Sequence, residues 1–300
     1  MGRKPTKREL MRKDSDKKRR AAWAPTEEVV QLYPGSQDEE TPLGKDDSML
    51  TVVNAATGAT ILQRLPTASM RSHRRIIALA KEGRTVCNDL WEAVVQSGQK
   101  DVIFYELTKK NAKKKGGSQS LAVGLMWYAG QKGASAEWGW AMAHEVAPVE
   151  AAAMLRWLKA FVELTVETHF RQGRIAEDFA AHIKAREAVR GVMQRALGVD
   201  GANQVHRYFH TGEVIQGITG GFHLDPHDDV PNILINLGSA VELQLAEYGK
   251  VHMDVATVVL FNNRELHHAV RSAPSSTTEE RWALTLGAWH AALEADDAQK

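Results

Sequence analysis

The 300-residue chain contains a single cysteine, Cys87. One thiol can form neither an intrachain disulfide nor a thiolate metal cluster, so the sequence predicts a reducing, intracellular environment and gives Cys87 the role of a small core residue. The chain also lacks any run of about 18 apolar residues, and its basic first residues have no apolar signal-peptide block. We therefore expect a soluble protein with no membrane partner.

The chain also has almost no net charge, because 38 basic and 37 acidic residues leave a formal charge of +1. The balance hides a basic N-terminus: ten of the eighteen residues from Arg3 to Arg20 are Lys or Arg. Such a run repels itself, so residues 1–20 are expected to form a disordered arm that neutralises phosphates. Its Lys-Lys-Arg-Arg cluster at 17–20 is typical of a nuclear-import signal and favours a nuclear location. A tail that only aids solubility would have the same composition.

The 43% hydrophobic composition is enough for a sizeable core in one large domain or two small ones. Residues 21–60 carry several Pro and Gly among acidic residues and are expected to be a linker or an irregular wrap. Residues 61–295 are expected to form a single domain. Within it, helical support occupies about 61–200 and a β-rich part about 203–290.

Hydrophobic periodicity predicts the elements of that domain. One or two helices are expected from Ser69 to about Ser97, and strands at 101–107 and 120–129 on either side of a lysine-rich loop. A helix should begin at Pro148, and another should run from about Ile175 and stop at Gly198. Short strands with turn residues then follow from Gln204. Helices before strands, rather than alternating with them, indicate an α+β fold with an antiparallel barrel or jelly roll.

Three His-x-Asp motifs occur in the β-rich part, so the motif alone identifies no site. They are His223-Leu-Asp225, His227-Asp-Asp229 and His252-Met-Asp254. A non-haem Fe(II) oxygenase needs two imidazoles and one carboxylate on one face of the metal. Residues i and i+2 of an extended strand point to the same side, so one motif can supply two of these ligands. A distant strand must supply the third.

The segment that follows an apolar run at 256–261 offers that third ligand as His267 or His268. Thirteen residues after His268, Arg281 opens another expected strand, 281–289. A guanidinium can hold the distal carboxylate of a dicarboxylate co-substrate through two parallel hydrogen bonds while the other end chelates iron.

This order of parts resembles the 2-oxoglutarate and Fe(II)-dependent dioxygenases, whose double-stranded β-helix carries His-x-Asp, a distal His and then an Arg. The distal ligand of that family is often followed by a small residue and Val, which favours His268 over His267. The pattern His-x-Asp-x-x-Asn from His227 to Asn232 is similar to the TET/JBP branch, which oxidises methyl groups on DNA pyrimidines. It favours His227 and Asp229 over the earlier pair. The resemblance covers about Gln204 to His290.

The resemblance implies a role for each residue. His227, Asp229 and His268 would bind Fe(II), Arg281 would clamp 2-oxoglutarate, and Asn232 would bond the co-substrate or the target base. The partners implied are O2 and a methylated DNA duplex with 5-methylcytosine as the favoured target. An enzyme of this kind must flip the base and stack it on aromatic or planar side chains. Candidates for that contact are Tyr208, Phe209, Trp289 and His290.

Two departures from the family pattern affect the co-substrate and the base. Ala283 stands two residues after Arg281, where the superfamily often has Ser, and Trp289 stands where the animal TET enzymes have a base-contacting histidine. The same iron core also serves protein and small-molecule hydroxylases. A cupin-like metal protein with hydrolytic or isomerase chemistry, a DNA-binding module without catalysis, and a barrel that binds no metal are further possible interpretations of the same residues.

Overall fold

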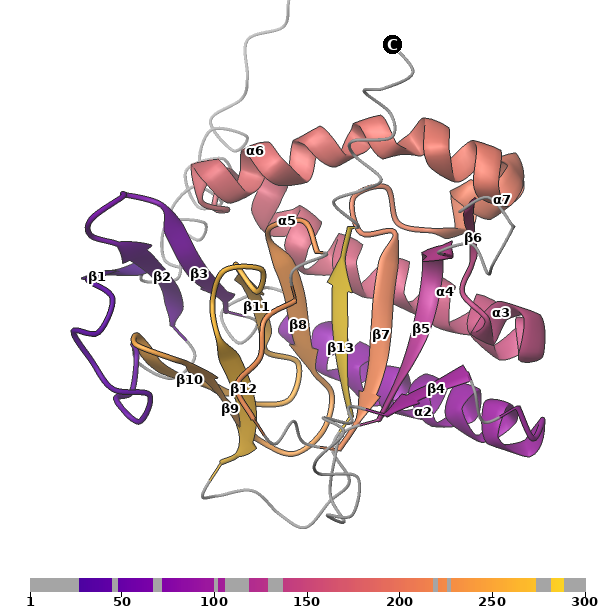
Figure 1. The fold of residues 1–300 in the computed structure, drawn as a ribbon, viewed down its shortest axis with the longest axis horizontal. Helices are drawn as coiled ribbons and strands as arrows, with labels where there is room; N and C mark the ends of the chain where they lie inside the picture. Colours follow the sequence, from indigo (N-terminus) through magenta and orange to yellow (C-terminus); the bar gives the residue numbers. More distant parts are fainter. Residues whose placement is uncertain are drawn as a thin grey trace, which may run out of the picture.

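The computed structural model describes nine segments of the chain, which are 27–44, 48–66, 72–99, 102–105, 119–128, 137–217, 221–225, 228–273 and 282–288. They build a large sheet that is covered on one face by helices and faced on the other by a smaller sheet (Figure 1). This arrangement confirms the α+β class and the double-stranded β-helix expected from the sequence.

The large sheet has ten strands in the order β1-β2-β3-β11-β8-β13-β7-β5-β4, with β6 paired to β5. All of its pairings are antiparallel except that of β1 with β2. Its strands are β1 (Glu27–Leu32), β2 (Met49–Asn54), β3 (Thr60–Leu65), β4 (Ile103–Tyr105), β5 (Gln119–Tyr128), β6 (Glu137–Trp140), β7 (Thr211–Gln216), β8 (Asn232–Asn236), β11 (Val258–Phe261) and β13 (Trp282–Gly287).

The smaller sheet has the order β10-β9-β12, with strands β9 (Val241–Leu245), β10 (Gly249–Met253) and β12 (His268–Ser272). A single antiparallel bridge from His223 to His268 adds a short fourth segment beside β12. Apolar side chains from the facing surfaces of the two sheets, among them Leu234, Leu243 and Val270, form one buried cluster. The two sheets are thus held together by a core of their own, as a sandwich requires.

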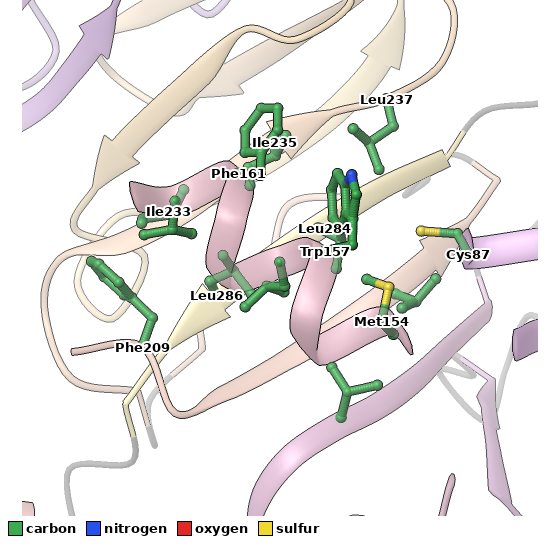
Figure 2. Packing of buried hydrophobic residues seen from close by; sticks show 14 of the residues in the cluster. Cys87, Met154, Trp157, Phe161, Phe209, Ile233, Ile235, Leu237, Leu284 and Leu286 are labelled. Carbon is green, nitrogen blue, oxygen red and sulfur yellow. The ribbon is translucent and has the colours of Figure 1, made fainter. Parts of the chain in front are cut away.

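The helices cover the other face of the large sheet. They are α2 (His73–Gln96), α3 (Ala143–Val146), α4 (Pro148–Leu164), α5 (Val166–Arg171), α6 (Glu177–Ala185), the 3-10 helix η2 (Arg186–Val189) and α7 (Arg190–Gln204). Figure 2 shows Met154, Trp157 and Phe161 of α4 packed with Ile233 and Leu284 of the sheet. Cys87 belongs to the same cluster, and burial raises the pKa of its thiol, which confirms it as a core residue.

Alternation along the sheet strands explains the two cores. Ile233 and Ile235 on β8 face the helices, whereas Leu234 faces the smaller sheet. On β13, Trp282, Leu284 and Leu286 likewise face the helices, while Ala283 packs against the smaller sheet. Successive side chains along β8 and β13 therefore point alternately to the helical layer and to the space between the sheets.

Several sequence expectations are confirmed and others are corrected. A single helix fills 73–96, and α4 begins at Pro148. Residues 21–60, expected as a linker or irregular wrap, instead contribute β1 and β2 to the large sheet. The helix expected to stop at Gly198 continues to Gln204 across a kink, because Gly198 takes φ 72° and the helix resumes beyond it.

The strand expected at 204–210 is absent from this described segment, and the following stretch, Thr211–Gln216, forms β7 instead. The basic arm at 1–20 lies outside the described residues. Within the described residues, no helix is both long and apolar enough to cross a membrane.

Candidate metal centre

Two histidines meet where the bridge joins the loop before β8 to the start of β12. The backbone N–H of His223 donates to the His268 carbonyl, and the N–H of His268 donates back to His223, each over 3.0 Å. Residues paired in this way project their side chains to the same side of the sheet. The two imidazole rings accordingly lie 4.3 Å apart between centroids.

Asp225 completes a three-residue cluster. Its side chain lies on the same side of the extended segment as His223, two residues earlier, and its N–H donates to the Asn263 carbonyl over 3.1 Å. The Nε2 atom of His268 lies 3.5 Å from its Oδ2, and that of His223 lies 3.8 Å from its Oδ1. One ligand atom from each of the three side chains lies within 4.8 Å of the others.

The orientation of each ring leaves Nε2 directed at the cluster. The Nδ1 atom of His268 lies 3.0 Å from the Leu266 carbonyl oxygen, and the Nδ1 atom of His223 lies 3.2 Å from that of Gly221. With each Nδ1 placed against a backbone carbonyl, Nε2 is the ring nitrogen that faces Asp225, the arrangement of protein sites that bind metals through histidine. The ring of Phe261 packs edge-on against His268 at 5.0 Å and restricts its rotation.

A buried amide network supports the carboxylate. Asn263 donates its side-chain amide to Asp225 over 3.0 Å and to Asp228 over 2.7 Å. Asn232, the first residue of β8, donates its amide to the same oxygen of Asp228. These hydrogen bonds thus connect Asp225 and Asp228 to the first residue of β8 and to the turn before β12.

The electrostatics of the two aspartates differ. Burial raises the pKa of Asp225, but hydrogen bonding and charge from His268, together with the Asn263 amide, outweigh it, so the net pKa is lowered and the group is a carboxylate at neutral pH. Burial together with the nearby charge of Asp225 raises the pKa of Asp228 to about 6, against the opposing hydrogen bonds of Asn263 and Asn232. Asp225 is therefore the ionised acceptor in this cluster.

Asp229 is used differently. Arg186, the first residue of η2 and fully buried, donates Nε to its Oδ2 over 2.8 Å. Nη2 of the same guanidinium donates to the Asp229 and Pro231 carbonyls over 3.0 and 2.8 Å. The carboxylate of Asp229 thus neutralises a buried cation, and among the described residues it lies outside the cluster of His223, Asp225 and His268. Its assignment as a ligand together with His227 stays a prediction.

The remaining candidate residues have mixed outcomes. His268 lies in the cluster as expected, whereas His227, Arg281, Trp289 and His290 lie outside the described residues. Tyr208 and Phe209 are core residues rather than an open stacking platform: the Tyr208 hydroxyl donates to Glu187 over 3.1 Å, and the Arg186 guanidinium lies 5.2 Å from the Phe209 ring centroid. The pair His252 and Asp254 is 3.1 Å apart at the end of β10. It is not part of the cluster.

Asn232 lies at the same end of the space between the sheets. It pairs with Phe261 across β8 and β11, and it faces the interior side as Leu234 does. Its Oδ1 is buried with no hydrogen-bond partner among the described residues. A Cβ on Gly287 would lie 2.0 Å from that oxygen, so the glycine gives Asn232 its room.

Sequence reasoning missed Asn263 and Arg186. Asn263 lies in the turn between β11 and β12, where paired asparagines usually indicate only a turn. Arg186 falls within a helical pattern, and its burial depends on Asp229, 43 positions later. The charge pattern of the helix gave no signal of that contact.

Among known proteins, the chain is matched by structure and not by sequence. No protein-family model matches it, and a search of curated proteins finds no match. A solved structure of NgTET1 in complex with 5mC DNA matches 89% of this chain and 84% of its own, with a TM-score of 0.52 and 11% sequence identity.

Two further solved structures match less fully. A prolyl hydroxylase from Trichoplax adhaerens, in complex with a hypoxia inducible factor peptide fragment, covers 72% of this chain and 82% of its own at 14% identity and a TM-score of 0.32. A 2OG-Fe(II) oxygenase family oxidoreductase from Burkholderia pseudomallei covers 27% and 42% at 17% identity and 0.21. The match to NgTET1 shows that the chain shares the fold of that protein, which confirms at the level of fold the TET-like resemblance found in the sequence.

Proposed function

We propose that the chain is an Fe(II)- and 2-oxoglutarate-dependent dioxygenase that oxidises methylated bases in DNA, with 5-methylcytosine as the favoured target. The observation that carries the proposal is the convergence of His223, Asp225 and His268 inside a TET-like fold. The match to a structure in complex with 5mC DNA supports the choice of substrate.

The cluster fits a ferrous ion. Two imidazoles and one carboxylate form the donor set of non-haem iron oxygenases, which leaves positions open for co-substrate and O2. Ligands about 2.1 Å from a first-row metal lie about 3 Å apart when adjacent. The separations of 3.5 and 3.8 Å therefore need to close by less than about 1 Å on binding. His223, Asp225 and His268 are accordingly the proposed ligands, in place of His227 and Asp229.

Arg281 remains the proposed clamp for 2-oxoglutarate. It immediately precedes β13 in the chain, two residues before Ala283, which faces the smaller sheet. In this role its planar guanidinium would hold the distal carboxylate of the co-substrate through two parallel hydrogen bonds.

Asn232 is proposed to contact the target base or a bridging water. Its amide nitrogen donates to Asp228, so the remaining Oδ1 is an acceptor. An acceptor suits an N–H donor such as the exocyclic amine of a cytosine, and not the carboxylates of the co-substrate. This assigns Asn232 to base recognition rather than to the clamp.

Fe(II) and 2-oxoglutarate, when bound, supply the oxidising chemistry that breaks the C–H bond of a methyl group. The chain's own part is to orient both imidazoles through their Nδ1 carbonyl partners, hold Asp225 ionised, and exclude water from the space between the sheets. A methyl group inside a duplex is stacked, so the base must also be flipped out to reach the cluster.

The test measures succinate formed from 2-oxoglutarate by anaerobically purified protein supplied with Fe(II) and then O2, with methylated duplex present. We expect iron-dependent succinate and oxidised nucleosides by mass spectrometry, both lost in His223→Ala and Asp225→Ala. Duplexes that carry 5-methylcytosine, thymine or N6-methyladenine identify the base. Iron-dependent succinate without any oxidised nucleoside would instead indicate a protein or small-molecule hydroxylase, and no iron-dependent succinate would exclude the oxygenase.

A further inference from the structure

A second polar site lies among the helices. Its pocket of about 440 Å³ is lined by residues of α4 and α5, by Arg190 and Asn203 at the two ends of α7, and by the segment 205–207 before β7. Four of the lining residues are cationic and two are anionic, which gives the lining a formal charge of +2. These residues are Lys159, Arg171, Arg190 and Arg207 against Glu163 and Glu167.

The cations fall into two groups. Arg171 and Arg207 both pair with Glu167, which also accepts a hydrogen bond from the buried ring of His206. Lys159 and Arg190 instead donate to neutral oxygens of Asn203, the backbone carbonyl over 3.2 Å and the side-chain amide over 2.7 Å. Among the described residues, these two have no recorded carboxylate partner, so they are available to an anionic ligand.

The paired cations are also held in place. The Arg207 guanidinium lies 4.5 Å over the ring of Tyr208, whose hydroxyl is fixed by Glu187. Hydrogen bonding from His206, together with Arg171 and Arg207, holds the pKa of Glu167 at about 2 despite burial. An ionised, buried Glu167 therefore anchors one wall of the pocket at neutral pH.

The pocket is connected to the end of the fold that carries the metal cluster. Its segment 205–207 is separated by three residues from Thr211, the first residue of β7, which pairs with Gly287 beside Asn232. Arg190 follows η2, whose Arg186 holds the backbone at Asp229 and Pro231. A long substrate at the cluster therefore has a cationic pocket at the same end of the large sheet.

We infer that this pocket binds a phosphodiester group of the nucleic-acid backbone. The choice of nucleic acid rests on the proposed function. Arginine and lysine around a concave surface are the usual partners of backbone phosphates, and such contacts position a substrate without reading its sequence. The pocket size also falls within the range of about 300–1,000 Å³ typical of ligand sites.

The experiment is fluorescence anisotropy of an end-labelled methylated duplex with the full chain, without iron, across a range of salt concentrations. The double variant Lys159→Gln/Arg190→Gln removes the two cations that bind neutral partners. A matched control, Arg75→Gln/Lys81→Gln, removes the same charge from exposed positions on α2. Thermal unfolding midpoints establish that both variants are folded.

We expect the pocket variant to bind at least about tenfold more weakly near 50 mM salt, with a slope of log K against log salt reduced by about two. The control should keep nearly the wild-type slope, and Lys159→Arg/Arg190→Lys should restore binding. Equal slopes for pocket variant and control, or no duplex binding by the wild type, would overturn the inference.

A measurement with inorganic phosphate distinguishes free phosphate from the nucleic-acid backbone as the ligand of the pocket. If the pocket variant loses stabilisation by inorganic phosphate but keeps wild-type duplex binding, the pocket binds free phosphate and the backbone assignment is wrong. Because anisotropy needs no turnover, failure of the succinate and nucleoside assays does not alter this result. The two proposals therefore fail separately.

Discussion

At the residue scale, the candidate centre depends on which side-chain atoms already have hydrogen-bond partners within the protein. Leu266 and Gly221 occupy Nδ1 of the two histidines, and Arg186 occupies the carboxylate of Asp229. The proposed ligand set thus depends on the partners of neighbouring groups as well as on the three proposed ligands.

Asn263→Ala is expected to weaken metal binding by about 10- to 100-fold, because it removes the amide that orients Asp225. The measurement is an anaerobic Fe(II) titration. Asn262→Ala is the control, since the side chain of that neighbour hydrogen-bonds Glu265 and not the aspartates. If the two variants bind iron equally well, the amide network does not support the ligand.

His268 and the two adjacent His-x-Asp motifs could be singled out from the sequence, but its preference for Asp229 differs from the carboxylate that the described residues bring into the cluster, Asp225. The selection followed a local pattern that ends at Asn232. The cluster forms through a long-range backbone bridge from His223 to His268, and Asp229 is instead paired with Arg186. Neither contact leaves a signal in the spacing of a single chain segment.

At the scale of elements, η2 anchors the segment between Asp225 and β8. Removing one partner of a buried ion pair leaves a charge unneutralised at a cost of about 3–5 kcal/mol. Arg186→Met is therefore expected to lower the free energy of unfolding by about that amount. Urea unfolding measures it, and Arg186→Met/Asp229→Asn should recover part of the loss. If Arg186→Met is as stable as wild type, the ion pair of Arg186 and Asp229 contributes little to stability.

The packing of α2 on α4 gives a second prediction. A Cβ on Gly83 would lie 2.1 Å from the Trp157 ring, which also donates its N–H to the Leu79 carbonyl over 2.7 Å. Alanine favours a helix over glycine by about 1 kcal/mol, but overpacking costs about 1–3 kcal/mol. Since the 2.1 Å contact is far too short, we expect overpacking to win and Gly83→Ala to be destabilising by up to about 2 kcal/mol in urea unfolding. A stabilised variant would contradict this helix contact.

Elements with a clear period could be predicted, as α2, α4 and most strands of the barrel show. β1 and β2 could not, because their sequence is broken by turn residues and their pairing depends on β3, β10 and the chain between them. The stretch 204–210 has strand-like residues, but its side chains fill the helical core and the Glu167 network instead. Tertiary contacts outweighed local preference at both places.

At the scale of the whole molecule, buried neutral histidines should control acid stability. Burial lowers the pKa of His144 and His169 to about 4 and that of His210 to about 3. Below the ordinary pKa of about 6.5 the unfolded chain binds protons at these sites and the folded chain does not, so stability falls as the pH falls. Asp228 acts in the opposite direction, because its raised pKa of about 6 favours the folded state in acid.

The three histidines destabilise the folded state in acid more than Asp228 stabilises it. From the size of these pKa shifts, after allowance for partial exposure, we expect the free energy of unfolding to fall by about 3 kcal/mol between pH 7.5 and pH 5. Urea unfolding at several pH values measures it. A free energy of unfolding that stays constant or rises over this range would show that these histidines are not held neutral.

The central claim is that His223, Asp225 and His268 bind the metal. The most direct measurement is Mn(II) binding followed by electron paramagnetic resonance, with Fe(II) as competitor, in Asp225→Ala and in His227→Ala. The account predicts that Asp225→Ala loses the bound signal while His227→Ala keeps an affinity close to wild type. Retention by Asp225→Ala and loss by His227→Ala would contradict it.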